Sequence, residues 1–171
     1  MNLDATAGNR VMWKGKTPPD FIFVDREYNL AKPPDVFADN RYLPFRDNVF
    51  DLTIYDPPYH VRGSNTKWMF FNPDQTKTFG GATSTHYGLY RSKRELITNL
   101  HKATKEFLRV SSRLCFKWGE GTLSLWKILP LFKPWVEVFR RWVGVGGYQR
   151  KSRTVWVTFT VDKQTKRMGP K

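Results

Sequence analysis

The chain has very little cysteine and no long apolar run, and these absences exclude several classes of protein. Its single cysteine, Cys115, leaves no partner for an intrachain disulfide and excludes a cysteine-rich metal site. No apolar stretch approaches the roughly 18 residues that a membrane-spanning helix needs, and the first residues show no secretory signal pattern. His86 and His101 lack ligand-like spacing to acids or to the cysteine. We therefore expect a cytoplasmic protein with no bound metal and no membrane contact.

Acidic residues are also scarce. The 171 residues include 29 lysines and arginines but only 15 aspartates and glutamates, for a formal net charge of +14. This excess favours an anionic partner, nucleic acid ahead of a membrane surface, although a merely soluble basic surface would carry the same charge. The 40% hydrophobic content is typical of a packed core. We expect one domain over residues 1–162 and a basic tail over 163–171; a homodimer or a protein partner is left open.

Acids follow the ends of four predicted strands. Phe21–Val24 is continuously apolar, as buried parallel strands are, and Asp25 follows it. The other three predicted strands, near residue 3 and over 35–38 and 50–55, end in the same way at Asp4, Asp39 and Asp56. Strands that alternate with crossovers predict an α/β fold, whose ligand edge lies at the carboxyl ends of the strands. Asp25 also follows Asp4 by 21 residues, close to the spacing of about 20 that places an acid on ribose hydroxyls; a helix N-cap is its alternative role.

The fourth of these strands ends most abruptly. Pro57 and Pro58 lack an N–H and fix φ near −65°, so the strand has to stop at Asp56. The chain then turns rigidly, with a carboxylate, prolyl carbonyls and the ring of Tyr59 at one point. A carboxylate and a carbonyl can accept two N–H bonds while a ring stacks, which suits a planar group that bears an amine. The alternative is a strand-ending turn without a ligand.

The rest of the chain alternates again after one long irregular segment. Residues 60–90 show no periodicity but many aromatics, which predicts a lid or a substrate-contacting loop. Ser92 to Glu95 forms a capping box and opens a helix that continues to Leu108. Further predicted elements are a strand over 113–118, a helix over 122–132 that Pro130 disturbs, and strands over 135–143 and 154–161. A hairpin-like loop joins the last two strands, so the final strand is predicted to be antiparallel.

This order of elements, with Asp-Pro-Pro-Tyr after the fourth strand, resembles the class I S-adenosylmethionine-dependent methyltransferases. More narrowly, the chain is similar to compact single-domain bacterial and phage members of that class. The segments that carry the resemblance are LDATAGNRVMW at 3–13, LPFRDNVFDLTIYDPP at 43–58, FKWGE at 116–120 and RKSRTVW at 150–156. It implies an α/β Rossmann-like fold: a seven-stranded, mostly parallel sheet with an antiparallel last strand and helices on both faces.

The resemblance also implies a cofactor and a set of site residues. S-adenosylmethionine would lie against the loop after the first strand, where Gly8 and small residues let backbone amides approach a ligand. The implied cofactor contacts are Asp4, Ala5, Thr6, Ala7, Gly8, Asn9, Asp25, Asp39, Asn40 and Asp56. The implied catalytic residues are Asp56, Pro57, Pro58 and Tyr59. The implied substrate contacts are Tyr59, His60, Trp68, Lys117, Trp118, Arg150, Lys151 and Arg153.

Some of these roles have structural alternatives. His60 could equally be an ordinary loop histidine, Trp68 could pack the lid rather than stack on a base, and the basic segment at 150–153 could be a solvated hairpin. The loop after the first strand lacks the second and third glycines usual in the class, and its strand is only three residues long.

The resemblance implies methylation of an exocyclic amino group of a nucleic-acid base. Adenine N6 is favoured over cytosine N4 and guanine N2, and DNA slightly over RNA, with an rRNA or tRNA adenine N6 or guanine N2 methyltransferase as the first alternative. A protein amide is a second alternative target. A non-catalytic nucleic-acid-binding subunit with the same fold is the third, and the unusual cofactor loop favours it.

Overall fold

The computed structural model describes residues 1–14, 16–61, 69–71, 77–79, 90–120, 122–144 and 153–161. The elements of the N-terminal half are β1 Asn2–Asp4, the 3-10 turn η1 Val11–Trp13, β2 Phe21–Asp25, β3 Val36–Phe37, β4 Leu52–Tyr55, β5 Met69–Phe71 and β6 Lys77–Phe79. The elements of the C-terminal half are α1 Lys93–Val110, β7 Arg113–Gly119, α2 Leu125–Ile128, the 3-10 turn η3 Leu129–Phe132, β8 Val136–Gly144 and β9 Arg153–Thr160.

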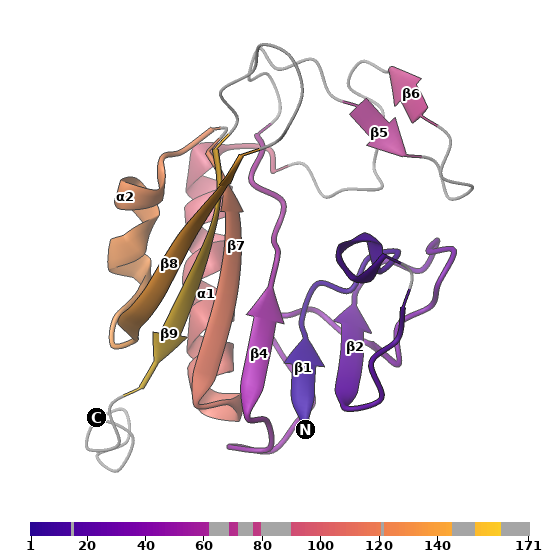
Figure 1. The fold of residues 1–171 in the computed structure, drawn as a ribbon, viewed down its shortest axis with the longest axis horizontal. Helices are drawn as coiled ribbons and strands as arrows, with labels where there is room; N and C mark the ends of the chain where they lie inside the picture. Colours follow the sequence, from indigo (N-terminus) through magenta and orange to yellow (C-terminus); the bar gives the residue numbers. More distant parts are fainter. Residues whose placement is uncertain are drawn as a thin grey trace.

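Seven of these strands form one sheet in the order β3-β2-β1-β4-β7-β9-β8 (Figure 1). The pairs from β3 to β7 are parallel, whereas β9 runs antiparallel to both β7 and β8. The predicted seven-stranded sheet with an antiparallel last strand is therefore confirmed. Because β1 and β4 are neighbours but the chain leaves them in opposite directions, the carboxyl ends of β1, β2 and β4 meet at the point where a ligand binds in open α/β sheets.

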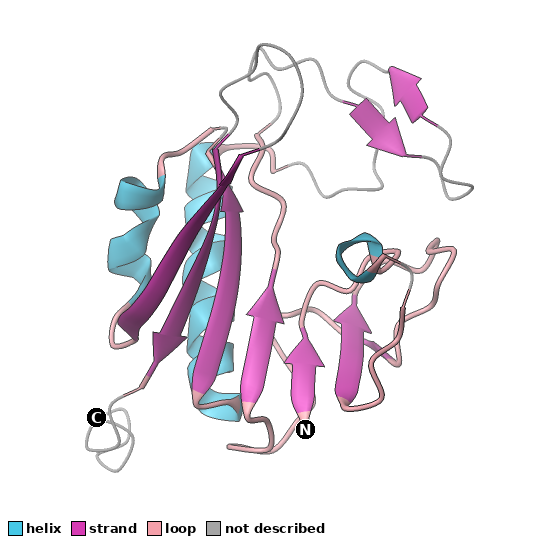
Figure 2. Cartoon of the chain, viewed as in Figure 1, coloured by secondary structure: helices cyan, strands magenta, loops and turns pink. Residues whose placement is uncertain are grey.

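The two faces of the sheet are covered differently. On one face Val24, Tyr55 and Phe116 join the main core with α1, and the ring centroids of Tyr55 and Phe107 lie 4.7 Å apart. On the other face Phe23 contacts Trp13 of η1, with centroids 6.1 Å apart. Figure 2 shows α1 behind the strands and η1 on the near side. Helical cover on both faces was predicted; in the described part of the chain, the cover on the second face is this single 3-10 turn.

Helix α1 begins where its capping box predicts. The Ser92 hydroxyl oxygen accepts a hydrogen bond from the Glu95 N–H at 3.1 Å, and the Glu95 carboxylate accepts one from the Arg91 N–H at 2.6 Å. Leu96, Leu100, Ala103, Phe107 and Val110 are fully buried along one face of this helix. The predicted amphipathic helix is confirmed, and it ends two residues later than predicted, at Val110.

Two predictions of local structure were wrong. The helix predicted over 122–132 starts only at Leu125, where the Glu120 carboxylate accepts from the Leu125 N–H at 3.0 Å, and it tightens into η3 at Pro130. The segment 60–90, predicted to lack regular structure, contains the antiparallel pair of β5 and β6. Isolated three-residue strands fall below the length at which a sequence pattern signals a strand.

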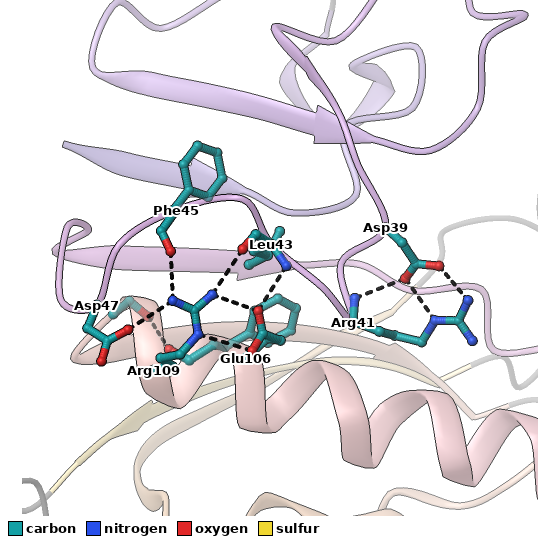
Figure 3. Close-up of polar contacts among 9 residues, drawn as sticks. Asp39, Arg41, Leu43, Phe45, Asp47, Glu106 and Arg109 are labelled. Carbon is teal, nitrogen blue, oxygen red and sulfur yellow. Dashed lines mark hydrogen bonds and ion pairs between the residues drawn. The ribbon is translucent and has the colours of Figure 1, made fainter. Parts of the chain in front are cut away.

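The connection from β3 to β4 is fixed to α1 by one arginine (Figure 3). The Arg109 guanidinium donates to the Phe45 carbonyl at 2.7 Å, to the Leu43 carbonyl at 3.0 Å and to the carboxylates of Asp47 and Glu106 at 2.9 and 2.7 Å. Burial by itself would raise the pKa of Glu106, but the bonds from Arg109 and from the Leu43 N–H hold that pKa below its usual value. The segment that leads into β4, and so into Asp56, is thereby held on the helix.

No helix in the described ranges is long and apolar enough to cross a membrane.

Candidate active site

The loop that follows β1 connects three neighbouring strands. The Ala5 N–H donates to the Ile54 carbonyl of β4 and the Ala7 N–H to the Val24 carbonyl of β2, both at 3.0 Å. Gly8 has φ of +48°, a conformation that side chains disfavour, and a Cβ placed there would meet nothing within 4 Å. The loop is therefore rigid on its inner side and open beside Gly8, where a ligand can approach the backbone.

Asp4 supports this loop from inside. Its side chain is 1% exposed, and its two carboxylate oxygens accept from the Trp13 indole N–H at 2.7 Å and from the Thr6 N–H at 3.1 Å. Burial raises its pKa to about 6, against the lowering effect of these two hydrogen bonds and with a small contribution from nearby Asp56 and Asp25. The described contacts of the Asp4 side chain therefore hold the loop in place, and its contact with the cofactor stays a prediction.

Asp25 and Asp39 stand at the ends of β2 and β3. One Asp25 oxygen accepts from the Gly8 N–H at 2.8 Å, and the other accepts from the Glu27 N–H at 3.0 Å. Each carboxylate oxygen can accept two hydrogen bonds, so Asp25 retains capacity for a ligand hydroxyl. Asp39 is clamped by Arg41, which donates to both of its oxygens and holds its pKa below the usual value although burial opposes this (Figure 3).

The other two predicted cofactor contacts lie on either side of the same loop. The Asn40 side-chain amide donates to the Ala5 carbonyl at 3.4 Å, and the Asn9 side-chain oxygen accepts from the Ala31 N–H at 2.7 Å. The cofactor residues predicted on four separate strand ends are thus brought together at one edge of the sheet.

Asp56 is tied to both the loop and β7. Its N–H donates to the Thr6 hydroxyl oxygen at 2.8 Å, and the Lys117 ammonium donates to one of its carboxylate oxygens at 2.6 Å. Burial raises the pKa of Asp56, and the positive charge and hydrogen bond of Lys117 oppose that rise. Among the described residues, no group donates to its second carboxylate oxygen. A half-buried carboxylate with one open oxygen can accept an N–H from a bound molecule.

Tyr59 lies directly on Gly119 at the end of β7. A Cβ on Gly119 would come within 2.6 Å of the Tyr59 ring, so any larger residue there would have to displace the ring. The ring also makes an edge contact with Trp118, at 5.9 Å between centroids, and lies 4.1 Å from His60. Burial raises the pKa of Tyr59 and lowers that of His60 to about 4, so both rings are neutral at pH 7. Neutral rings suit stacking rather than ion pairing with a phosphate.

Several predicted substrate contacts have a different place from the one expected. Trp118 is 0% exposed, donates its indole N–H to the Leu123 carbonyl at 3.0 Å and packs edge-on against Tyr59. Its contact with substrate stays a prediction. Lys117, predicted to contact substrate, forms an ion pair with the Asp56 carboxylate. Trp68, Arg150, Lys151 and the side chain of Arg153 lie outside the described residues.

Three roles were missed by reasoning from the sequence. Thr6 holds the backbone of Asp56, Gly119 gives room to Tyr59, and Trp13 is bonded to Asp4. A glycine directly after the strand predicted over 113–118 was the available signal for the second of these. The described residues contain no group of three or more His, Cys, Asp or Glu side chains placed to hold a metal ion.

Solved structures resemble this fold, and two of them are described here, although no family model and no curated protein sequence matches the chain. One is NodS, an N-methyltransferase from Bradyrhizobium japonicum WM9, with a TM-score of 0.52 and 10% identity over 95% of this chain and 85% of that chain. The other is the hMettl16 catalytic domain in complex with MAT2A 3′UTR hairpin 1, with a TM-score of 0.57 and 12% identity over 95% of this chain and 64% of that chain. At these identities the likeness shows the fold alone: a Rossmann-like fold of the methyltransferase type.

Proposed function

We propose that this protein is an S-adenosylmethionine-dependent N-methyltransferase that modifies an exocyclic amino group of a nucleic-acid base. One observation carries the proposal: the Thr6 hydroxyl accepts from the Asp56 N–H at 2.8 Å, which joins the glycine-bearing loop to the acid of the Asp-Pro-Pro-Tyr segment. A donor at the loop and an acceptor at the acid would then be neighbours. The likeness in fold to an N-methyltransferase supports the same conclusion.

The residues around the loop fit the cofactor. Gly8 presents open space beside its backbone, Asp25 has acceptor capacity for hydroxyl groups, and Asp56 places negative charge close by. S-adenosylmethionine, when bound, supplies a methyl group on a positively charged sulfur. Carboxylates near the loop favour such a cation electrostatically. The chain's own contribution is therefore to orient the acceptor amine, since alignment is the main requirement of an in-line displacement.

Asp56 and the Pro57 carbonyl would hold that amine. An aromatic amino group is a poor nucleophile because its lone pair is delocalised into the ring. Two N–H bonds, one to the open oxygen of Asp56 and one to the Pro57 carbonyl, favour the pyramidal nitrogen and stabilise the positive charge that develops on it. A methylated amine would release one proton, which Asp56 or solvent would accept. Tyr59 would stack on the base, which has to be unpaired or flipped out to reach it.

Lys117 opposes the effect of burial on the acid. Burial would otherwise favour the protonated carboxyl, which could accept fewer hydrogen bonds. The ammonium, 2.6 Å from one oxygen, stabilises the ionised form against the effect of burial, and the other oxygen would accept from the substrate amine. The protein can thus keep a hydrogen-bond acceptor in a partly buried site at neutral pH.

A nucleic-acid substrate is supported by the net charge of +14 and by the Asp-Pro-Pro-Tyr sequence itself. Within this class we favour adenine N6, and DNA slightly over RNA. RNA is the second candidate, and the complex of the hMettl16 catalytic domain with an RNA hairpin supports it. Incubation with labelled cofactor and parallel DNA and RNA pools, followed by nucleoside mass spectrometry, distinguishes the two and identifies the base.

Asp56→Ala tests the role of the acid. We expect methyl transfer to be abolished while cofactor affinity, measured by calorimetry, stays within a few-fold. Asp51→Ala is the matched control, because Asp51 precedes the same strand, at its opposite end, and pairs with the N-terminal amine on the surface. Near-full turnover by Asp56→Ala would show that the assigned role is wrong. A well-folded wild-type protein that binds no cofactor would instead favour the non-catalytic alternative.

A further inference from the structure

The strand register places four side chains in one row across the sheet. Tyr55 pairs with Phe116, so Asp56 lies beside Lys117; Lys117 in turn pairs with Trp156 of β9. Trp156 pairs with Arg141 of β8. The first three side chains of this row are also in contact, because the Lys117 ammonium lies 2.6 Å from the Asp56 carboxylate and 5.8 Å from the centre of the Trp156 ring. With strands about 4.8 Å apart, the row extends about 14 Å from the candidate catalytic acid.

This row lies on the face of the sheet opposite α1. Phe116 and Trp118 flank Lys117 in β7, and Val155 and Val157 flank Trp156 in β9; all four flanking residues are fully buried in the core. Because successive side chains of a strand point to opposite faces, Lys117 and Trp156 point away from α1. Figure 1 views the sheet from this side, with α1 behind β7 and β9.

The same face is apolar, aromatic and open beyond the row. Phe139 and Val143 share the side of β8 that carries Arg141, and they are 57% and 41% exposed. Arg141 is exposed and makes no ion pair with any described residue. Its neighbour Arg140 points to the other face, where it pairs with Glu137 and lies 4.6 Å from the centre of the Trp126 ring. The open face therefore differs from the α1 face: Arg141, its cation beside Trp156, makes no ion pair with a described residue, whereas Arg140 on the α1 face does.

We propose that this face, defined by Lys117, Trp156, Arg141 and Phe139, binds the single-stranded nucleotides that flank the target base. The inference rests on the proposed function and names how the substrate strand is held. Aromatic rings next to cations are the features with which proteins bind single strands, because bases stack on the rings and phosphates pair with the cations. The row ends at Asp56, so a strand lying along it delivers its next base to the acid.

Charge argues against a second copy of the chain as the occupant. A symmetric contact would bring Arg141 and Lys117 close to the same residues of the other copy, and like charges facing each other at an interface oppose association. A polyanionic strand meets the same cations with the opposite sign.

The test measures binding of fluorescent oligo-dT and oligo-U strands of about a dozen nucleotides, without cofactor. A stacked base contributes about 1–3 kcal/mol, so we expect Trp156→Ala to weaken binding by about 5- to 150-fold. Trp126→Ala, which removes a 66% exposed tryptophan from α2, should leave affinity within twofold. Arg141→Ala should weaken binding and lower the salt dependence by about one released ion, whereas Arg140→Ala, with the same change in net charge, should not lower it. Trp156→Phe should retain most of the affinity, which separates loss of stacking from loss of folding.

Equal affinities of Trp156→Ala and Trp126→Ala would overturn the proposal and would leave the methyltransferase proposal intact. Trp156→Ala that converts a wild-type dimer to a monomer without weakening oligonucleotide binding would assign the face to a second copy and would also overturn it. Conversely, Trp156-dependent binding without any methylated nucleoside would contradict the proposed function while the binding face stands.

Discussion

Gly119→Ala is the sharpest available test of how Tyr59 is positioned. Gly119 is buried at the end of β7, and an added Cβ would lie 2.6 Å from the Cε2 and Cζ atoms of the Tyr59 ring. Carbon atoms in contact are about 3.5–4.0 Å apart, so the ring has to move by about 1 Å. A displacement of about 1 Å at a reacting centre costs on the order of 100-fold in rate.

We therefore expect Gly119→Ala to lower kcat for methyl transfer roughly 100-fold, or about 2.7 kcal/mol in the activation free energy. Cofactor affinity should change little because, among the described residues, the loop after β1 makes no hydrogen bond to Gly119. Overpacking should also lower the free energy of unfolding by about 1–3 kcal/mol.

A double-mutant cycle separates the ring from other effects of the substitution. On a Tyr59→Ala background the clash is absent, so Gly119→Ala should cost almost nothing further in rate or in stability. The assay is single-turnover methyl transfer with labelled cofactor, with urea unfolding in parallel. Near wild-type transfer by Gly119→Ala, or an undiminished penalty in the Tyr59→Ala background, would refute the reasoning.

Two further predictions concern stability. Arg109→Ala removes the hydrogen bonds that hold the β3–β4 connection on α1. We expect the free energy of unfolding to fall by roughly 2 kcal/mol and Tm, measured by calorimetry, to fall by about 4–8 °C. Lys102→Ala on the exposed side of the helix is the control, and an equal Tm for the two variants would contradict the role of Arg109. Asp4 has its pKa raised to about 6 from 3.8, so the folded state holds its proton more tightly and the associated stability is present below pH 4 and lost as pH rises to about 6. This pKa difference corresponds to roughly 3 kcal/mol in the free energy of unfolding. As pH rises from 4 to 7, the stability of Asp4→Asn relative to wild type, measured by urea unfolding, should therefore increase by about that amount. A stability difference that does not change with pH would contradict the assignment.

Much of the fold could be predicted because local signals agreed with the tertiary arrangement. The apolar run at Phe21–Val24, the capping box at Ser92 and the double proline after Asp56 each fix an element or its end by steric or hydrogen-bonding rules that act within a few residues. The short strands could not be predicted, because they lack such local signals. In β5 and β6 three residues carry no usable periodicity, so their pairing with each other decides their conformation.

The candidate site, too, could be predicted only in part. Reasoning from strand ends brought Asp25, Asp39 and Asp56 to one edge of the sheet, because parallel strands all end on the same side. It could not distinguish an acid that faces a ligand from one that holds the loop. Only the structure shows that Asp4 is buried and hydrogen-bonded within the loop, and that Trp118 is buried in the core.

The sequence alone determined which residue types stand where strands end, and with them the chemistry that a site at that edge can perform. Only the tertiary structure decided which of those groups touch. Lys117 lies 61 positions beyond Asp56 in the sequence, and it reaches the acid because β4 and β7 are paired in a register that no local pattern encodes. The row that continues to Trp156 and Arg141 has the same origin, since contacts between strands depend on register and packing over the whole sheet rather than on the few residues around each side chain.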